Sequence, residues 1–443
     1  MSALLIIPAG PLAASLLGAL LSIIPMRRFE EGVSAAAAIL AVLFALLSLG
    51  RPDGANALFY IDGVSKIMSL TVSLIYLGAV VYSITYLKHL ENPLFQKGFY
   101  YFLVNMFAAT MLFTVVAANL GLMWVGIEAT TITSALLVAT ENNDTTIEAA
   151  WRYIIIASSG LVISLVSIVL LYASRGTLDL SVYLRAEGGG RLFTIGAALA
   201  IVGYGTKAGL FPLGTWLPDV HGRAPAPVSA LFSSVLVPVA MYGIFRVVEV
   251  APAAQTRLFL LVFGLLTVGT AAFLLARQDD YKRMFAYSTA ESMGIILIGL
   301  GSGTIGALGA LVVLIAHAFA KSAVFFLSGN LLARYKSTRI REIRGVATRM
   351  PRTAYTLLFA ALAVTGAPPF GVAVAVVIGA FLVLAFIAVN RRIVQMLFSE
   401  DSGTHMERGR VGTLVPIVNV ILSLAAIAVV PLLPGLLSGV AGK

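Results

Sequence analysis

Apolar runs of about 20 residues recur along the whole chain, separated by short polar segments. A run of that length crosses a bilayer core of roughly 30 Å as an α-helix. The longest polar interval, 334–352, is too short for a soluble domain. The pattern predicts an all-α polytopic membrane protein with about fourteen transmembrane helices, near residues 3–24, 32–50, 64–87, 99–117, 119–139, 149–173, 192–217, 227–248, 256–276, 284–301, 305–333, 353–370, 372–390 and 413–434.

Basic residues predict the orientation of these helices. With the N-terminus outside, the inside loops and their flanks carry 20 of the 30 Lys and Arg residues, against 7 on the outer side. Lys66, Lys207 and Lys321 lie within spans. Positive charge gathers on the cytoplasmic side, so we predict an outside N-terminus. No basic segment precedes the first span, and Arg27 and Arg28 follow it, which indicates a retained anchor rather than a cleaved signal.

The spans fall into four parts: 1–98 with three helices, 99–250 with five, 251–398 with five, and 399–443 with a loop and the last helix. Two consecutive sets of five lie inverted in the membrane, as in many transporters. In each set proline interrupts the fourth helix. The first break is at Pro212 in 192–217, and the second is at Pro368 and Pro369 in 366–371. Proline removes a backbone donor, which a membrane tolerates only where protein or water compensates, so the breaks predict a polar pathway.

Composition narrows the possible functions. The chain is 59% hydrophobic and 11% charged, with no cysteine, which excludes disulfides and cysteine-ligated metal or iron–sulfur sites. The net charge of +10 is explained by basic residues in the inside loops, so it does not indicate nucleic-acid binding. The sequence contains no Ser–His–Asp arrangement, phosphate loop or HExxH motif, so we predict no catalytic or metal site. Of four histidines only His317 lies in a span, which argues against haem ligation within the chain.

Glu128 lies deep within a span, in "NLGLMWVGIEATTITSALLVA", whereas the other nineteen acidic residues lie in loops or near span ends. A lone carboxylate at that depth costs several kcal/mol or takes up a proton, and either behaviour suits a proton carrier. The alternative is a structural carboxyl bonded to Thr130, Thr131 or Thr133.

Lys207 lies near mid-depth in the interrupted seventh span. A nearby carboxylate stabilises its charged form, so a partner that moves would make the lysine release or recapture a proton. The alternative is a static ion pair with Glu128 that only joins two helices. The adjacent Pro212 favours the first interpretation, because packing does not require a helix break.

In the eleventh span His317 and Lys321 are four residues apart on one helical face. Histidine relays protons at neutral pH, although a single histidine in a core is more often structural. Asp219 and His221, at the inner end of the broken span, either admit protons or cap helices. Glu291 either joins the relay or hydrogen-bonds Ser288 and Ser292.

Several long motifs resemble a known family. "MWVGIEATTITSALLVA", "GYGTKAGLFPLGTWLPDVHGRAPAPVSALFSSVL", "DDYKRMFAYSTAESMG" and "HAFAKSAVFFLSGNLL" are similar to the antiporter-like membrane subunits of complex I, hydrogenase-4 and formate hydrogenlyase complexes, most of all to the F component of hydrogenase-4. Multisubunit sodium/proton antiporters share this fold. The resemblance covers roughly residues 60–370.

The resemblance implies a fourteen-helix subunit with two inverted repeats and a central hydrophilic axis that carries protons. Glu128, Lys207, His317 and Lys321 match its proton-transfer residues. It implies no cofactor in this chain. Nickel–iron, iron–sulfur or flavin centres are expected only in partner subunits. The expected partners are other membrane subunits and a peripheral redox arm of the same complex.

Two departures from the family pattern stand out. The eighth span, "ALFSSVLVPVAMYG", has Ser233, Ser234 and Pro238 where a charged residue often continues the axis, so we expect water to bridge there. After Gly371 the expected charged segment is absent. Either the end of the axis is lost, or residues are missing from the sequence at that point.

We therefore predict a proton-translocating subunit of a hydrogenase-4-like or NADH:quinone oxidoreductase-like complex in a prokaryotic cytoplasmic membrane. The alternatives are a subunit of a multisubunit sodium/proton antiporter, and a structural scaffold that has lost pumping. The expected partners are lipid, protons and other subunits, and not nucleic acid.

Overall fold

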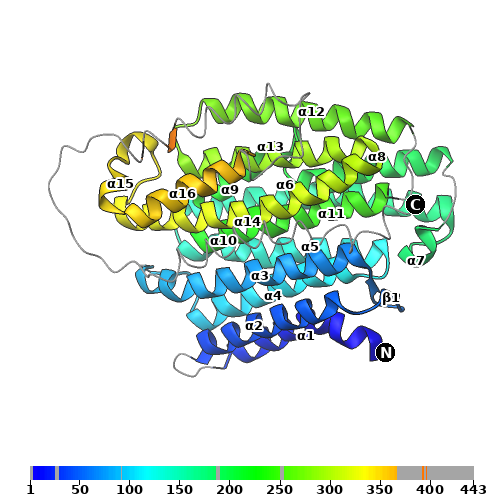
Figure 1. The fold of residues 1–443 in the computed structure, drawn as a ribbon, viewed down its shortest axis with the longest axis horizontal. Helices are drawn as coiled ribbons and strands as arrows, with labels where there is room; N and C mark the ends of the chain where they lie inside the picture. The colour runs from blue at the N-terminus through cyan, green and yellow to red at the C-terminus, as the bar shows by residue number, and fades with distance from the viewer. Residues whose placement is uncertain are drawn as a thin grey trace.

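The computed structural model describes residues 3–24, 29–90, 92–185, 190–249, 254–366, 392, 393 and 396. It is a bundle of helices that run mainly along its long axis (Figure 1). The helices are α1 (Ala3–Ser22), α2 (Phe29–Leu49), α3 (Gly63–Tyr86), α4 (Lys97–Val116), α5 (Leu120–Val138), α6 (Asp144–Arg175), α7 (Leu180–Tyr183), α8 (Arg191–Lys207), α9 (Trp216–Arg223), α10 (Ala226–Leu231), α11 (Val237–Val248), α12 (Ala254–Ala276), α13 (Tyr281–Gly301), α14 (Gly303–Tyr335), α15 (Val346–Arg349) and α16 (Pro351–Val364).

Within the described residues, nine helical segments are long and apolar enough to cross a membrane, and two shorter apolar helices accompany them. The prediction of a polytopic helical membrane protein is confirmed. The thirteenth and fourteenth predicted spans, 372–390 and 413–434, lie outside the described residues, as do Pro368, Pro369 and Gly371. The count of fourteen and the inverted repeats remain predictions.

The helices are arranged with α1 and α2 at one edge and α12 at the opposite edge (Figure 1). Between them, the continuous segment Ala226–Val248, formed by α10, a π-turn and α11, is entirely buried. A membrane helix with no lipid-facing side lies at the centre of the protein. It is therefore available to carry polar groups that lipid would not tolerate.

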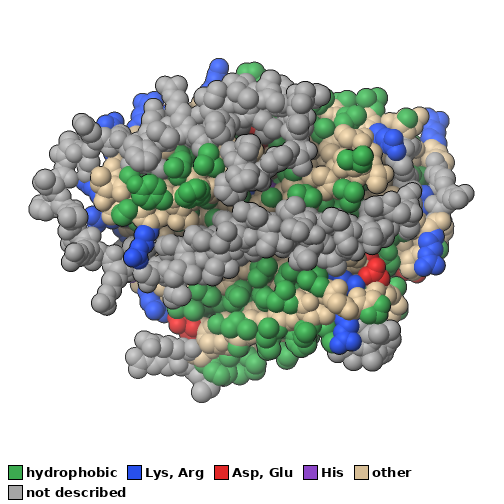
Figure 2. All heavy atoms as spheres, viewed as in Figure 1, with side chains coloured by type: hydrophobic (Ala, Val, Ile, Leu, Met, Phe, Trp, Pro, Cys, Tyr) green, Lys and Arg blue, Asp and Glu red, His purple; other side chains and the backbone are tan. Residues whose placement is uncertain are grey.

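Apolar side chains cover much of the surface. Ile39, Leu43 and Leu47 on α2 are about half exposed, as are Val162 and Val169 on α6. In Figure 2 apolar side chains form a band along the helices, and Lys and Arg gather toward the two ends of the molecule. This distribution is that of a protein whose middle faces hydrocarbon and whose ends face water.

A small β-hairpin, which the sequence pattern did not predict, joins α2 to α3. Strands β1 (Gly54–Ala55) and β2 (Tyr60–Ile61) pair in antiparallel fashion. Asn56 closes the turn, because its Oδ1 accepts hydrogen bonds from the backbone N–H groups of Leu58 and Phe59. Strands of two residues are too short to leave an alternating apolar pattern.

The seventh predicted span breaks earlier than its proline suggests. Helix α8 ends at Lys207, and Gly209 follows with a φ of 76°, a conformation that favours glycine. A Cβ on Gly214 would lie 2.2 Å from the Gly209 carbonyl oxygen, so the turn is too tight there for a side chain. Trp216 Nε1 donates to the Thr206 carbonyl at 2.8 Å, which satisfies an acceptor near the end of α8.

Candidate functional site

Lys207 ends α8 and points into the core. Its side chain is fully buried, and Nζ donates a hydrogen bond to Thr131 Oγ1 on α5 at 2.5 Å. The ammonium also lies 5.0 Å from the ring centre of Tyr153 on α6, a cation–π contact. The break positions the lysine, because α8 stops at this residue.

Glu128 lies on α5, three residues before Thr131. Its Oε1 accepts a hydrogen bond from Ser158 of α6 at 3.0 Å, and its Oε2 is buried without a hydrogen-bond partner. The carboxylate attracts the Lys207 ammonium, but the ammonium bonds to Thr131 and the carboxylate to Ser158, so the two do not form a direct ion pair. The neighbouring threonine hydroxyls bond to backbone carbonyls or to the lysine, so the predicted alternative of a threonine-bound Glu128 does not occur.

A π-turn at Phe232–Leu236 presents a carbonyl group to His317 of α14. The Val237 N–H bonds to the Phe232 carbonyl, and Pro238 has no N–H, so the Ser233 carbonyl lacks a helical donor. His317 Nε2 lies 3.2 Å from that oxygen. Because a carbonyl only accepts, Nε2 carries the hydrogen in this contact. The backbone of the eighth span thus contacts His317 directly, and the water bridge expected there stays a prediction.

Lys321 and Glu291 face each other between α14 and α13. Lys321 is fully buried, and its Nζ donates to the Phe285 carbonyl at 2.7 Å. Glu291 is 5% exposed, and its Oε1 has no hydrogen-bond partner. Lys321 is the charge that acts on it most strongly. Ser292 bonds to the Ser288 carbonyl instead of to the carboxylate, so Glu291 belongs with Lys321.

His221 on α9 lies in the core beside both clusters. It is fully buried, neither ring nitrogen has a hydrogen-bond partner, and the ring stacks on Phe325 with 4.8 Å between ring centres. The side chains of Lys321 and Lys282 lie near enough to act on it electrostatically. Buried polar atoms without a partner are rare and call for an explanation. His221 does not cap a helix.

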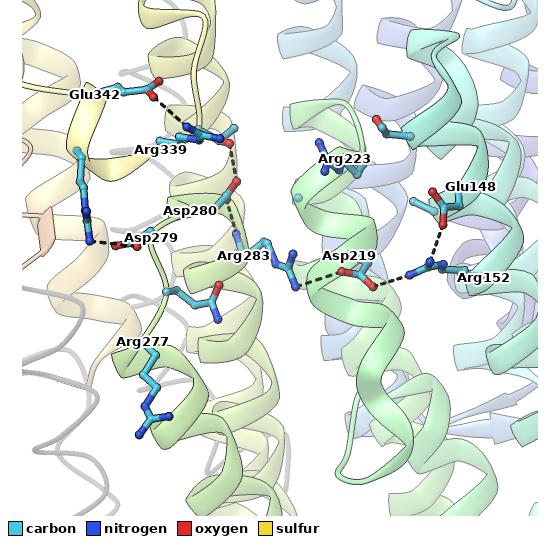
Figure 3. A pocket seen from close by; sticks show the side chains of 16 residues that line it. Glu148, Arg152, Asp219, Arg223, Arg277, Asp279, Asp280, Arg283, Arg339 and Glu342 are labelled. Atoms are coloured by element: carbon cyan, nitrogen blue, oxygen red, sulfur yellow. Dashed lines mark hydrogen bonds and ion pairs between the residues drawn. The ribbon is translucent and has the colours of Figure 1, made fainter.

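Asp219, two residues earlier, faces the opposite way, into an open polar cleft of about 800 Å³. Figure 3 shows its carboxylate between Arg152 of α6, at 3.7 Å, and Arg283 of α13, at 3.2 Å. Arg152 also pairs with Glu148. Asp219 and His221 are thus separated: one joins a charge chain at the surface, and the other is sealed in the core.

Sequence reasoning missed Lys282, which is 2% exposed and donates to the Ala224 carbonyl just after α9 at 2.7 Å. The predicted span began at 284, which placed this lysine in a loop. Its neighbour Arg283 contacts Asp219 on the same α9 helix, so adjacent residues of α13 hold α9 from its buried and its exposed sides.

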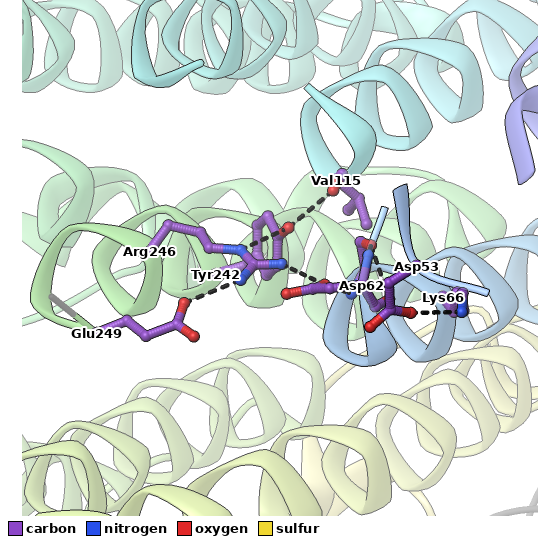
Figure 4. A network of polar contacts seen from close by, with 8 residues as sticks. Asp53, Asp62, Lys66, Val115, Tyr242, Arg246 and Glu249 are labelled. Atoms are coloured by element: carbon purple, nitrogen blue, oxygen red, sulfur yellow. Dashed lines mark hydrogen bonds and ion pairs between the residues drawn. The ribbon is translucent and has the colours of Figure 1, made fainter. Parts of the chain in front are cut away.

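Sequence reasoning also missed a buried charge cluster at the far end of the central helix, formed by Asp62, Arg246 and Glu249 (Figure 4). Arg246 is fully buried. Its Nη2 donates to Asp62 at 2.6 Å, its Nη1 to Glu249 at 2.9 Å, and its Nε to the Tyr242 hydroxyl at 2.8 Å. Burial raises the pKa of nearby Tyr60 to about 12, and the Asp62 charge adds to that rise.

Asp62 is held in its charged form. Burial alone raises the pKa of this carboxyl, but the Arg246 guanidinium and the hydrogen bonds from Ser65 outweigh it, so the pKa lies below its usual value. Asp62 also caps α3 by accepting the Ser65 N–H. The sequence signal was the Asp–Gly–x–Ser start of the third span. It predicts that Asp62 caps the helix, but not that Asp62 pairs with Arg246.

The predicted residues thus form two groups. Glu128 and Lys207 attract each other without direct contact, and His317, Lys321, Glu291 and His221 lie together farther along the core. Within the described residues, no group of three or more His, Asp or Glu side chains could hold a metal ion.

Comparison with known proteins identifies a family for this chain. Residues 117–403 match the family described as "NADH:quinone oxidoreductase/Mrp antiporter, TM". The chain is 32% identical over 376 residues to the hydrogenase-4 component F homolog of Methylacidiphilum infernorum, and the match covers 80% of this chain and 78% of that protein.

Two solved structures share the fold. A chain of the membrane-bound sulfane sulfur reductase, an archaeal respiratory membrane complex, superposes with a TM-score of 0.85 at 21% identity, covering 100% of this chain and 97% of that one. A chain of the Mrp complex from Dietzia sp. DQ12-45-1b superposes with a TM-score of 0.80 at 20% identity, with the same coverage of 100% and 97%.

Proposed function

The chain belongs to the NADH:quinone oxidoreductase/Mrp antiporter family, and we propose that it translocates protons as an antiporter-like subunit of a hydrogenase-4-like membrane redox complex. One observation carries the proposal: the fully buried Lys207 ammonium sits at a helix break and bonds to Thr131, one turn from Glu128. Packing alone does not require a charged group at a broken helix, whereas a proton carrier does.

The proposed mechanism is a change of charge state passed along the core. When Glu128 gains or loses a proton, its attraction for the Lys207 ammonium changes, and the lysine is biased to hold or release its own proton. The second group, His317 with Lys321 and Glu291, receives the proton in the same manner. His221 lies beside that group, and its two unpartnered ring nitrogens suit a proton relay.

Proton uptake is proposed at the cleft around Asp219. The cleft is polar and open, and it is lined by the α9 helix that carries His221 on its other side. By the charge bias of the loops, this end faces the cytoplasm. The ion pairs of Asp219 with Arg152 and Arg283 join α9 to α6 and α13 at this cleft.

A partner subunit is proposed to cover the outer side of Glu128. Val125 and Ile132, on the same face of α5, are 51% and 65% exposed, so the carboxylate lies at the edge of the bundle. A carboxylate next to lipid is costly, and a neighbouring subunit would supply a polar continuation. Electron transfer, with nickel–iron, iron–sulfur or flavin centres, is assigned to partner subunits in a prokaryotic cytoplasmic membrane.

The test is the ratio of protons pumped to electrons transferred by the assembled complex in proteoliposomes. Lys207→Ala and Glu128→Gln should each abolish pumping while the complex still assembles. Lys97→Ala is the matched control, because Lys97 is half exposed and far from the core group. Normal pumping by both core variants would refute the proposal and would favour a structural scaffold.

A second candidate is sodium/proton antiport, which the similarity to the Mrp complex favours. It predicts that a sodium gradient drives proton movement without electron transfer, and that Lys207→Ala removes this exchange. Proton pumping that is independent of sodium, measured in sodium-free buffer, would exclude it.

A further inference from the structure

The charge cluster of Asp62, Arg246 and Glu249 has no part in the mechanism above. It closes one end of the central helix Ala226–Val248, and the other end lies at Ala224, where Lys282 and the Asp219 cleft meet. A helix of 23 residues spans about 35 Å, so the two charged sites lie on opposite sides of the membrane core.

A row of residues on α14 leads from the buried relay toward this cluster. Ala310, Leu314, His317 and Lys321 follow one another at intervals of four, three and four residues, which places them on one face. Lys321 and His317 are the proton-transfer residues proposed above. Beyond them the row turns apolar.

Ala310 and Leu314 line a small enclosed cavity, together with Met68 of α3, Ile296 of α13, and Met241 and Phe245 of α11. Its volume of about 10 Å³ is at the threshold for one water molecule. An apolar cavity of that size stays dry at rest, and a dry constriction stops proton movement until water enters.

Tyr242 joins the cavity to the charge cluster. It lines the cavity, its hydroxyl accepts from Arg246, and it donates to the Val115 carbonyl at the end of α4. Tyr242 therefore lies between the cavity on one side and the guanidinium with its two carboxylates on the other.

The cluster holds two carboxylates around one guanidinium. The side chains of Asp62 and Glu249 are 15% and 20% exposed and reach the outer solvent, while Arg246 is fully buried behind them. Glu249 is the more exposed of the two carboxylates, so it is the one better placed to pass a proton to that solvent.

We infer that this cluster is the outer proton-release site of the chain, with the apolar cavity as its gate and Glu249 as the acceptor. A proton leaves the His317 group when water fills the cavity, passes Tyr242 through that water, and is released to the outside from Glu249. The inference rests on the proposed proton transport and names its outlet.

The test uses the assembled complex in proteoliposomes and measures protons pumped per electron transferred. Glu249→Gln removes the acceptor, and Ala310→Leu fills the cavity. Each should lower the ratio about tenfold. Glu31→Gln is the matched control, since Glu31 is a partly buried carboxylate paired with Lys97 and lies away from the route. It should pump like the wild type.

Thiol labelling provides an independent measurement, because the chain has no native cysteine. A small membrane-impermeant thiol reagent added from outside during electron transfer, when water enters the cavity, should label Ala310→Cys about ten times faster than Ala318→Cys, a buried alanine on the same helix that does not line the cavity. This arm keeps the inference testable if Glu249→Gln fails to assemble.

Two failures are distinguishable. If Lys207→Ala stops pumping while Glu249→Gln and Ala310→Leu pump normally, or if both cysteines are labelled equally slowly, the release site is wrong and the proposed function stands. If Lys207→Ala itself pumps normally, the proposed function is refuted, and so is the release site that rests on it.

Discussion

The ammonium of Lys207 bonds to the hydroxyl of Thr131 and not to the carboxylate of Glu128, one turn away on α5. Thr131 is the hydroxyl that accepts from this buried ammonium, and Ser158 is the one that donates to the carboxylate. Thr131 therefore supports the charged form of Lys207.

Thr131→Val should therefore impair proton pumping while preserving side-chain shape. A hydrogen bond to a charged group contributes about 1.5–3 kcal/mol, so the pumping rate should fall by one to two powers of ten. Thr131→Ser keeps the hydroxyl and should stay close to the wild type. Equal pumping by the valine and serine variants would mean that the hydroxyl has no role.

Pro238→Ala should weaken the contact between His317 and the Ser233 carbonyl. Alanine restores a backbone N–H, which can bond within the helix and convert the π-turn to regular α-helix. The His317 ring then loses its acceptor. The expected result is a pumping rate about tenfold lower, with the ring displaced in a cryo-EM map of the variant. A π-turn that persists in the variant would show that proline does not maintain it.

Asp62 should make stability depend on pH in the acid range. Its folded-state pKa is lower than its unfolded value, so its contribution is complete above about pH 4 and is lost as the pH falls through the folded pKa. The melting temperature of the detergent-solubilised protein should drop below pH 4. The Asp62→Asn variant should have a lower melting temperature than the wild type at pH 7, and its melting temperature should fall less between pH 4 and pH 3. An identical acid-range drop in both proteins would contradict the assignment.

Gly214→Ala should destabilise the break between α8 and α9. The added Cβ would lie 2.2 Å from the Gly209 carbonyl oxygen, which is backbone and cannot swing away. The expected cost is at least about 2 kcal/mol, seen as a lower melting temperature and reduced assembly. Gly32→Ala is the matched control, because its Cβ meets nothing within 4 Å. A loss of stability equal to that of the control would show that the turn can relax.

Periodicity and charge predicted the helices well because each apolar run is long and each loop is short. The same reasoning placed Lys207 within a helix, whereas it is the last residue of α8. Sequence located the break by its proline, but the chain leaves the helix five residues earlier, because Pro212 has no N–H for the carbonyl four residues before it and Gly209 permits the turn.

The polar contacts were less predictable because they are made by backbone atoms or by distant residues. The Ser233 carbonyl has no side-chain signature, and its availability depends on a π-turn that only the packed bundle reveals. Asp62 and Arg246 are separated by 184 residues, and each alone reads as an ordinary charge at a helix end. A single sequence cannot pair them.

The complete burial of Ala226–Val248 constrains how the protein is made. The ribosome delivers this segment before α13 and α14, which later cover part of it. During that interval Arg246 lies beside hydrocarbon unless Asp62, already synthesised, has paired with it. Early closure of this pair by the first three helices would shield the arginine during membrane insertion. Membrane insertion then depends on contacts between segments that the translocon releases at different times. An insertase would have to hold the unfinished bundle until α13 and α14 have been inserted.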